Sequence, residues 1–380
     1  MDVSLLVVVV IATALAFDFT NGFHDTANAM ATSIATGALQ PRVAVALSAG
    51  LNIVGALLST QVALTISSGI VDDLQISPAV IFGGLVGAIL WNLFTWLLGL
   101  PSSSSHALFG GLIGATWIAA GSDAVHFDEV VSKILLPALV APVVAGIVAL
   151  VATYLAYTLT RRARTDAVTT GFRRGQTISA SLVSLAHGTG DAQKTMGVIT
   201  LVLIASGHLP AGSDVPIWVI LCAGTAIGLG TLSGGWRIIR TMGKGLTDIE
   251  SPQGFAAETA STAVLLASAN LGFALSTTQV VSGSILGSGL GRKLADIRWT
   301  LAGRMALAWL VTLPAAGAVG AISGKVADSG TGGVVMVAIL LAGMVLLIWS
   351  LSRRNQVTHS NVNEAATSST GAGSPAPVAG

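Results

Sequence analysis

Long apolar stretches recur along almost the whole chain, and most of them are long enough to cross a hydrocarbon core of about 30 Å as helices. Of the 380 residues, 53% are hydrophobic and 9% are charged, which is far more apolar than an ordinary soluble protein. We therefore predict an all-α polytopic membrane protein with about 10–12 membrane segments. The apolar stretches lie near 3–20, 43–66, 79–100, 105–120, 134–160, 178–206, 216–235, 255–274, 299–322 and 332–351.

A motif that contains a carboxylate occurs once in each half of the chain. Residues 21–32 read NGFHDTANAMAT and residues 187–198 read HGTGDAQKTMGV, which aligns Asp25 with Asp191. Charged side chains at membrane depth are costly, so function is the default interpretation of such a residue. Glycines around both motifs permit irregular backbone whose carbonyls could join a cation site.

A hydroxyl cluster is also repeated, in the same order along the chain. Residues 99–114 read GLPSSSSHALFGGLIG and residues 272–287 read GFALSTTQVVSGSILG. The alignment places Ser103, Ser104 and Ser105 on Ser276, Thr277 and Thr278. A carboxylate and a hydroxyl cluster in each half predict one binding site that is built from both halves.

The distribution of Lys and Arg predicts the orientation of the chain in the membrane. Basic residues cluster at 161–174, 237–244, 292–298 and 353–354, which marks these segments as cytoplasmic. The N-terminus then lies outside and the C-terminus inside. When the crossings are counted from these segments, the two carboxylate motifs cross the membrane in opposite directions. We therefore expect an inverted-topology repeat with broken or re-entrant helices.

These patterns divide the chain into five parts. We expect a first membrane repeat, a basic cytoplasmic loop, a second and inverted membrane repeat, a final transmembrane helix and a disordered cytoplasmic tail. Their bounds are 1–160, 161–176, 177–322, 323–352 and 353–380.

Each hydroxyl cluster has the features of a helix that restarts inside the membrane. Pro101 ends the preceding helix, a serine can serve as the N-cap, and apolar helix resumes at Ala107. A helix N-terminus offers unpaired N–H groups and a positive potential, to which the hydroxyls add donors. Two such ends facing one another could surround a tetrahedral oxyanion. Alternatively, the hydroxyls bond to their own backbone or serve helix packing.

The two aspartates are candidates for coupling a cation to the bound anion. Asn28 lies beside Asp25, and Gln193 lies beside Asp191. Their oxygen atoms suit a hard monovalent cation, and the carboxylates could instead take protons. In a structural alternative, Asp191 and Lys194 form an ion pair three residues apart on a helix.

Three further titratable residues have open roles. Glu258 is either a coupling residue or an interfacial glutamate, and Asp18 is a similar but weaker candidate. His106 could hydrogen-bond an anion or be structural. An intramembrane hydrolase using a serine with His106 is an alternative function, but no base-orienting triad accompanies it. No basic run with interleaved aromatics suggests a nucleic-acid partner, and no nucleotide-binding motif or cofactor site is recognisable.

At these residues the chain resembles the inorganic phosphate transporter (PiT) family. The resemblance covers residues 18–32, 99–115, 186–200 and 254–322. It implies a bacterial inner-membrane symporter that takes up inorganic phosphate with protons or sodium, in some members as a neutral divalent-metal complex, and that forms a homodimer. The family's paired aspartates match Asp25 and Asp191, its phosphate motifs match Ser103 to Ser105 and Ser276 to Thr278, and a glutamate that it often carries matches Glu258.

The chain departs from the family pattern at four positions. His24 and Gly190 stand where the family commonly has asparagine, Gln279 stands where it has histidine, and Asn52 stands where some members carry a glutamate. The loss of amide and carboxylate oxygens favours proton coupling over sodium coupling. Because one branch of the family transports sulfate, another tetrahedral oxyanion, a sulfate permease is the alternative.

Overall fold

The computed structural model describes residues 3–72, 76–292 and 297–364, and it confirms the all-α fold class. Apart from helices, this part of the chain contains two isolated β-bridges. The longer helices are α1 (Val3–Ala35), α2 (Pro41–Ala56), α4 (Pro78–Leu98), α5 (Ser104–Ala120), α7 (Leu136–Thr160), α8 (Thr165–Ala205), α9 (Ile217–Ser233), α11 (Ser251–Asn270), α12 (Thr277–Gly291), α13 (Trp299–Ala327) and α14 (Thr331–Ser352). The shorter ones are α3 (Gln61–Gly69), η1 (Ser122–Ala124), α6 (Phe127–Val130), η2 (Val131–Leu135), α10 (Trp236–Arg240) and η3 (Thr241–Gly245).

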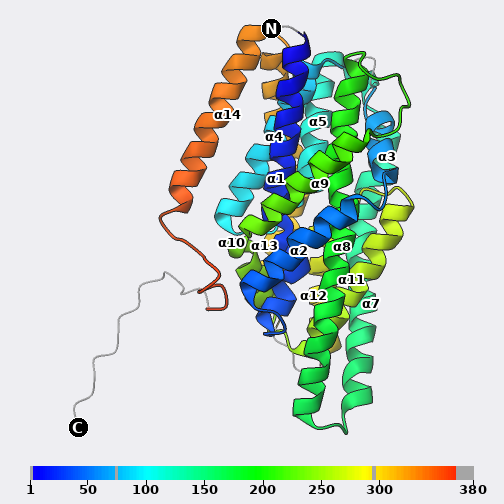
Figure 1. Ribbon diagram of the computed structural model, residues 1–380, viewed down its shortest axis with the longest axis vertical. Coiled ribbons are helices and arrows are strands. Elements are labelled where there is room, and N and C mark those ends of the chain that lie inside the picture. The colour runs from blue at the N-terminus through cyan, green and yellow to red at the C-terminus, as the bar shows by residue number, and fades with distance from the viewer. Residues whose placement is uncertain (1–2, 73–75, 293–296, 365–380) are drawn as a thin grey trace, which may run out of the picture.

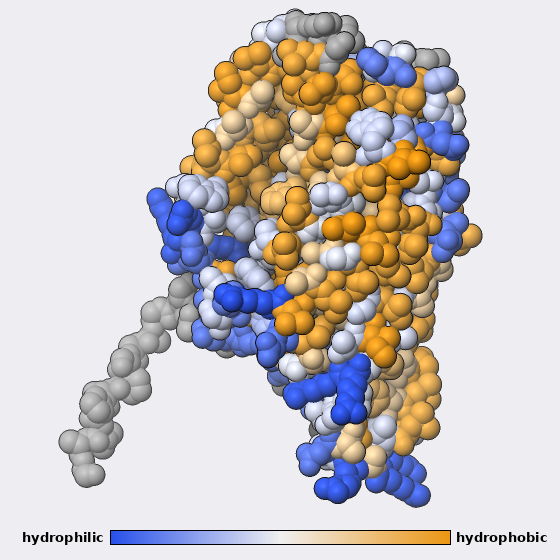
Figure 2. Space-filling model, viewed as in Figure 1, coloured by the Kyte–Doolittle hydropathy of each residue, from blue (hydrophilic) through white to orange (hydrophobic). Residues whose placement is uncertain are grey.

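Five helical segments are long and apolar enough to cross a membrane, and two bent helix pairs raise this number to seven. The bends measure 68° between α2 and α3 and 63° between α9 and α10. The number is below the expected 10–12 for two reasons. Helices α5 and α12 have only 17 and 15 residues, and α8 and α11 are long enough but not apolar enough to count. Figure 2 shows an apolar surface over most of the visible face, with hydrophilic residues at its lower end around the α7–α8 loop, below α14 and along the right edge.

The two carboxylate motifs lie on helices that run in opposite directions. In Figure 1, α1 starts at the end marked N, whereas α8 starts at the opposite end, after the α7–α8 loop. Both helices continue through their motifs, contrary to the expectation of irregular backbone there. The glycines serve close packing instead. A Cβ on Gly22 would lie 2.3 Å from the carbonyl oxygen of Ile227, and one on Gly188 would lie 2.3 Å from that of Asn52.

Helices of the two halves pack against each other in matched pairs. Helix α1 packs on α9, and α8 packs on α2. In the same way α5 packs on α13, and α12 packs on α7. The glycines of the hydroxyl motifs permit this contact, because a Cβ on Gly110 would lie 2.3 Å from the Leu313 carbonyl oxygen and one on Gly283 would lie 2.3 Å from that of Pro142.

A tight connection precedes each hydroxyl-capped helix. Gly99 ends α4 with a φ of 66°, and Gly272 follows α11 with a φ of 73°, a region that favours glycine. Ser103 then caps α5 by accepting the N–H of His106 at 3.1 Å. Helix α5 therefore starts at Ser104, three residues before the predicted Ala107, because the serine run itself supplies the cap.

The chain after α14 folds back onto the end of the molecule where α10 lies. Arg237 donates to the carbonyl of Asn355 at 2.5 Å, and Arg240 donates to that of Asn361 at 2.6 Å. Val362 is buried. The described part of the expected disordered tail, through Glu364, therefore makes defined contacts because its carbonyls pair with arginines. Residues 365–380 lie outside the described residues.

Candidate functional site

The hydroxyl clusters lie at the N-termini of α5 and α12, and all their side chains are buried. Ser103 and Ser276 act as N-caps, the latter by accepting the N–H of Gln279 at 3.3 Å. The other members, Ser104, Ser105, Thr277 and Thr278, form the first turn of each helix. Their backbone N–H groups have no intrahelical acceptor, so each cluster combines hydroxyl donors with the positive end of a helix dipole.

Asp25 is buried and contacts both hydroxyl clusters. Ser104 donates to its Oδ2 at 2.6 Å, and Thr278 donates to its Oδ1 at 3.2 Å. The adjacent His24 places Nδ1 at 2.8 Å from Oδ1. Since Ser104 comes from the first half and Thr278 from the second, this carboxylate joins the two halves at one point.

Asp191 has an arrangement of the same kind with a stronger positive partner. Lys194 donates to Oδ1 at 2.5 Å, and Thr277 donates to the same oxygen at 3.0 Å. His187 Nε2 lies 3.2 Å from Oδ2. The expected alternative, an ion pair between Asp191 and Lys194, is therefore present, and it lies within the cluster rather than apart from it.

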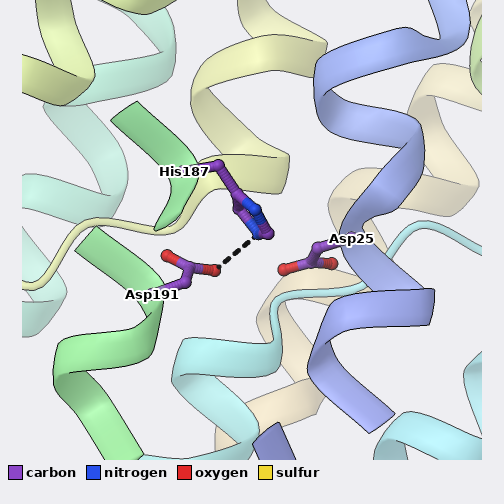
Figure 3. Close-up of side chains that lie close together, drawn as sticks. All are labelled: Asp25, His187 and Asp191. Carbon is purple, nitrogen blue, oxygen red and sulfur yellow. Dashed lines mark ion pairs between the residues drawn. The ribbon is translucent and has the colours of Figure 1, made fainter. Parts of the chain in front are cut away.

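The two carboxylates face each other across a short gap. Asp25 on α1 and His187 and Asp191 on α8 point toward one another (Figure 3). Each offers a ligand atom, and these atoms lie within 4.8 Å of one another. Two carboxylates and an imidazole at this separation suit a metal ion that accepts oxygen and nitrogen ligands.

In each half, one residue after the aspartate contacts the hydroxyl cluster of the other half. Lys194 donates to Ser105 at 2.5 Å, and Asn28 donates to Thr278 at 3.0 Å. The repeat alignment that pairs Asp25 with Asp191 also pairs Asn28 with Lys194, since both lie three residues further on. A neutral amide in the first half is thus replaced by an ammonium group in the second.

Glu258 lies in a separate buried cluster toward the C-terminal end of α1. Its Oε1 accepts hydrogen bonds from Thr32 and Ser33 at 2.6 Å each and from Gln176 at 3.2 Å. Ser179 donates to its Oε2. With 3% of its surface exposed, Glu258 is not an interfacial glutamate that reaches toward water.

Gln193 points away from the carboxylates toward the start of α3. Its Oε1 accepts the N–H groups of Val62 at 2.7 Å and Ala63 at 3.3 Å, and its Nε2 donates to the Thr189 carbonyl at 2.5 Å. These bonds use both ends of its amide. Although Gln193 was expected beside a coupling cation, its observed contacts cap a helix, because a glutamine side chain at this position of α8 faces α3.

Two residues were absent from the expected set of site residues. His24 bridges Asp25 to Thr95, whose Oγ1 lies 3.2 Å from His24 Nε2. Lys194 bridges Asp191 to Ser105. Lys194 could have been predicted from the repeat, because it aligns with the expected site residue Asn28. For His24 the sequence offered only its position next to Asp25.

The arrangement can bind an anion and couple it to positive charge. Two helix N-termini and Lys194 attract an anion, and four hydroxyls can donate to it. The same hydroxyls bond to Asp25, Asp191 and their partners, so a bound anion would compete with the carboxylates for donors. Carboxylates that lose donors beside an anion favour the uptake of a proton or cation.

Comparison with known proteins assigns the chain to a family. Residues 21–320 match the Phosphate transporter family. A probable low-affinity inorganic phosphate transporter of Mycobacterium bovis is 56% identical over 361 residues, which are 94% of this chain and 87% of the relative. A relative of the same name from Bacillus subtilis is 41% identical over 326 residues, or 85% and 98% of the two chains.

A solved structure has the same fold. It is described as the sodium-dependent phosphate transporter, and it matches with a TM-score of 0.77 at 22% identity, covering 85% of this chain and 99% of the other. The family and these relatives are named as transporters, which agrees with the predicted transporter and not with the alternative of an intramembrane enzyme. With its multi-pass helical fold, the chain belongs to the phosphate transporter family.

Proposed function

We propose that the protein is a secondary transporter that takes up inorganic phosphate together with a coupling cation. The observation that carries this proposal is the sharing of hydroxyl donors between two buried carboxylates at two helix N-termini. Phosphate binds where Ser104, Ser105, Thr277 and Thr278 converge. The names of the family and of the relatives support phosphate and leave the sulfate alternative without support.

The chemistry of the site also favours phosphate over sulfate. At neutral pH phosphate keeps a proton that it can donate to a carboxylate, whereas sulfate has none. Asp25 and Asp191 lie beside the hydroxyl clusters and can accept such a hydrogen bond. A site with buried carboxylate acceptors therefore discriminates against an anion that only accepts.

Coupling follows from competition for the same donors. When Ser104 and Thr277 turn toward phosphate, Asp25 and Asp191 lose donors and face a negative ligand. A proton or cation then binds more tightly, and by thermodynamic reciprocity that cation tightens phosphate binding by the same factor. The protein would thus carry the two together.

The proton is the coupling ion that the side chains favour. Lys194 already supplies a positive charge at Asp191, so its ammonium group would repel a sodium ion that bound there. At Asp25 the neighbouring group is His24, an imidazole that can carry a proton. The pair His24 and Asp25 is therefore the proposed proton site, while the coupling role of Glu258 rests on its burial among four neutral donors.

Alternating access by an inverted repeat is consistent with the matched packing of the halves. Helices α1 and α8 run in opposite directions, and each packs on the second helix of the other half. Exposed Arg161, Arg162 and Arg164 in the α7–α8 loop support a cytoplasmic position for that end. We accordingly place the protein in the plasma membrane with its N-terminus outside.

The decisive experiment measures uptake of radiolabelled phosphate or sulfate in proteoliposomes under imposed ion gradients. An inward proton gradient is expected to drive accumulation of phosphate, whereas an inward sodium gradient at equal pH gives little accumulation and sulfate is not taken up. Accumulation driven by sodium alone would contradict the proton assignment, and sulfate uptake would contradict the substrate.

A divalent metal that travels with phosphate is a second candidate cargo. The ligand atoms of Asp25, His187 and Asp191 within 4.8 Å favour it, since they could hold the metal of a neutral metal-phosphate complex. In the uptake experiment a further arm adds radiolabelled manganese. Parallel entry of manganese and phosphate would support the complex, and phosphate entry at full rate without any divalent ion would exclude a requirement for it.

Removing hydroxyls from both clusters is expected to weaken phosphate binding. Ser104→Ala combined with Thr277→Ala should raise the apparent KM about 10- to 150-fold for each hydroxyl, because a hydrogen bond to a charged group contributes about 1.5–3 kcal/mol. Uptake kinetics in proteoliposomes measure the change. The matched control is Ser261→Ala, which removes a buried hydroxyl that bonds only to its own helix. Unchanged kinetics in the double variant would place the anion elsewhere.

A further inference from the structure

A cavity of about 280 Å³ lies beside the end of α14, where the chain that follows this helix folds back. Helices α4, α9, α10 and α14 contribute to its walls, and residues 356–358 close one side. In Figure 1 this region lies on the left, between the lower end of α14 and α10. None of the described residues that line it belongs to the hydroxyl clusters or to the pair of aspartates, so it is separate from the proposed transport site.

The cavity carries positive charge. Arg237 and Arg353 line it, and no carboxylate does so among the described residues. Arg237 donates to the carbonyl of Leu97 at 3.1 Å and to that of Ser352 at 2.8 Å. These carbonyls accept hydrogen bonds, but they do not neutralise the charge of the guanidinium group. The cavity is therefore expected to attract an anion.

Three tryptophans, Trp96, Trp236 and Trp349, also line the cavity. The guanidinium carbon of Arg237 lies 5.9 Å from the Trp96 ring centroid, and that of Arg353 lies 4.9 Å from the Trp349 ring centroid. Both distances are typical of cation–π contacts, which favour these positions of the two charges. The Nε1 of Trp96 is buried and has no hydrogen-bond partner among the described residues. Since buried N–H groups are almost always paired, this donor indicates that a ligand supplies the acceptor.

The cavity lies at the boundary between an apolar and a hydrophilic surface. Helix α14 is apolar enough to cross a membrane, and its residues Leu346 and Leu347, one turn before the cavity, are exposed. Figure 2 shows the hydrophilic surface below α14 next to this apolar surface. Tryptophan at such a boundary lies at the level of the lipid headgroups. A phospholipid could therefore place its headgroup in the cavity and its acyl chains along α14.

We propose that this cavity binds a phosphate group, presented by an anionic phospholipid or as free phosphate. Arginine suits this ligand because its planar set of N–H donors matches the oxygens of a phosphate. The exposed apolar surface of α14 favours the lipid as the source. The bound group would connect α14 and residues 356–358 to α10 and α4, and it would hold the C-terminal segment against the end of the molecule.

The test is equilibrium binding of radiolabelled phosphatidylglycerol to the purified full chain in detergent, with radiolabelled inorganic phosphate in a separate arm. The unmodified protein is expected to bind phosphatidylglycerol saturably. Phosphatidylcholine should compete several-fold more weakly, because its choline group would face the guanidinium groups. Arg353→Gln should weaken binding about fivefold, which is the effect of one basic side chain near an anionic lipid. Arg353→Lys should retain most of the binding.

Arg354→Gln is the matched control, because Arg354 is an exposed neighbour that does not line the cavity. Trp349→Leu removes the aromatic partner of Arg353 and should also weaken binding. This second variant decides the matter if Arg353→Gln does not fold, as judged by its elution and thermal unfolding.

Binding of either ligand that depends on Arg353 and not on Arg354 supports the site and identifies the source of the phosphate group. Three results would overturn the proposal: no saturable binding of either ligand, equal binding by the Arg353→Gln and Arg354→Gln variants, or equal competition by phosphatidylcholine. Inorganic phosphate that binds at the hydroxyl clusters adds a component that Arg353→Gln leaves unchanged. The outcome is therefore independent of the proposed transport function.

Discussion

Asp25→Asn is expected to abolish the accumulation of phosphate against a gradient while the protein still folds and inserts. The amide keeps the size of the side chain, so the local packing is preserved. Its single carbonyl oxygen can accept from Ser104 or from Thr278, and the other hydroxyl must turn to accept from the amide NH2 group. It cannot take a proton or carry a negative charge. The His24 imidazole then loses its anionic partner, so the proposed proton site no longer links anion binding to proton binding.

Proteoliposome uptake under an inward proton gradient measures this loss, with accumulation expected to fall at least a hundredfold. Exchange of internal for external phosphate without a gradient separates loss of coupling from loss of binding, and it should persist at a reduced rate. Asp214→Asn, which changes an exposed loop aspartate, serves as the control. Near-normal accumulation by Asp25→Asn would refute the coupling role of this carboxylate.

Lys194→Met is expected to destabilise the protein strongly. It removes the ammonium group from a buried aspartate, and breaking a buried ion pair from one side costs about 3–5 kcal/mol because the remaining charge is uncompensated. His187 Nε2 lies 3.2 Å from Asp191 Oδ2 and can offset part of this cost by taking a proton. Thermal unfolding in detergent should show a clear drop in the unfolding temperature.

The double variant Asp191→Asn with Lys194→Met separates stability from function. Removing both charges should restore most of the thermal stability, because no buried charge is left alone. The double variant should not accumulate phosphate, since the second carboxylate is gone. If Lys194→Met unfolds at the temperature of the unmodified protein, the ion pair contributes little, and the lysine is then free to serve the anion alone.

Much of the candidate site could be predicted from the repeated motifs. The hydroxyl clusters and the two aspartates stand out because polar residues in apolar sequence are rare and costly. Gln193 shows the limit of this reasoning. The nearby Asp191 faces the other carboxylate. Successive residues of a helix are rotated by about 100°, so Gln193, two positions later, faces α3 instead.

The sequence by itself determined the fold class and pointed to the two aspartates and the two hydroxyl clusters, because the length of apolar runs and the presence of polar residues within them are local properties. Only the tertiary structure decided which hydroxyl meets which carboxylate and that Lys194 also reaches Ser105 of the other half. These contacts join residues 79 to 253 positions apart in the sequence, so they depend on how the helices pack, which no local pattern encodes.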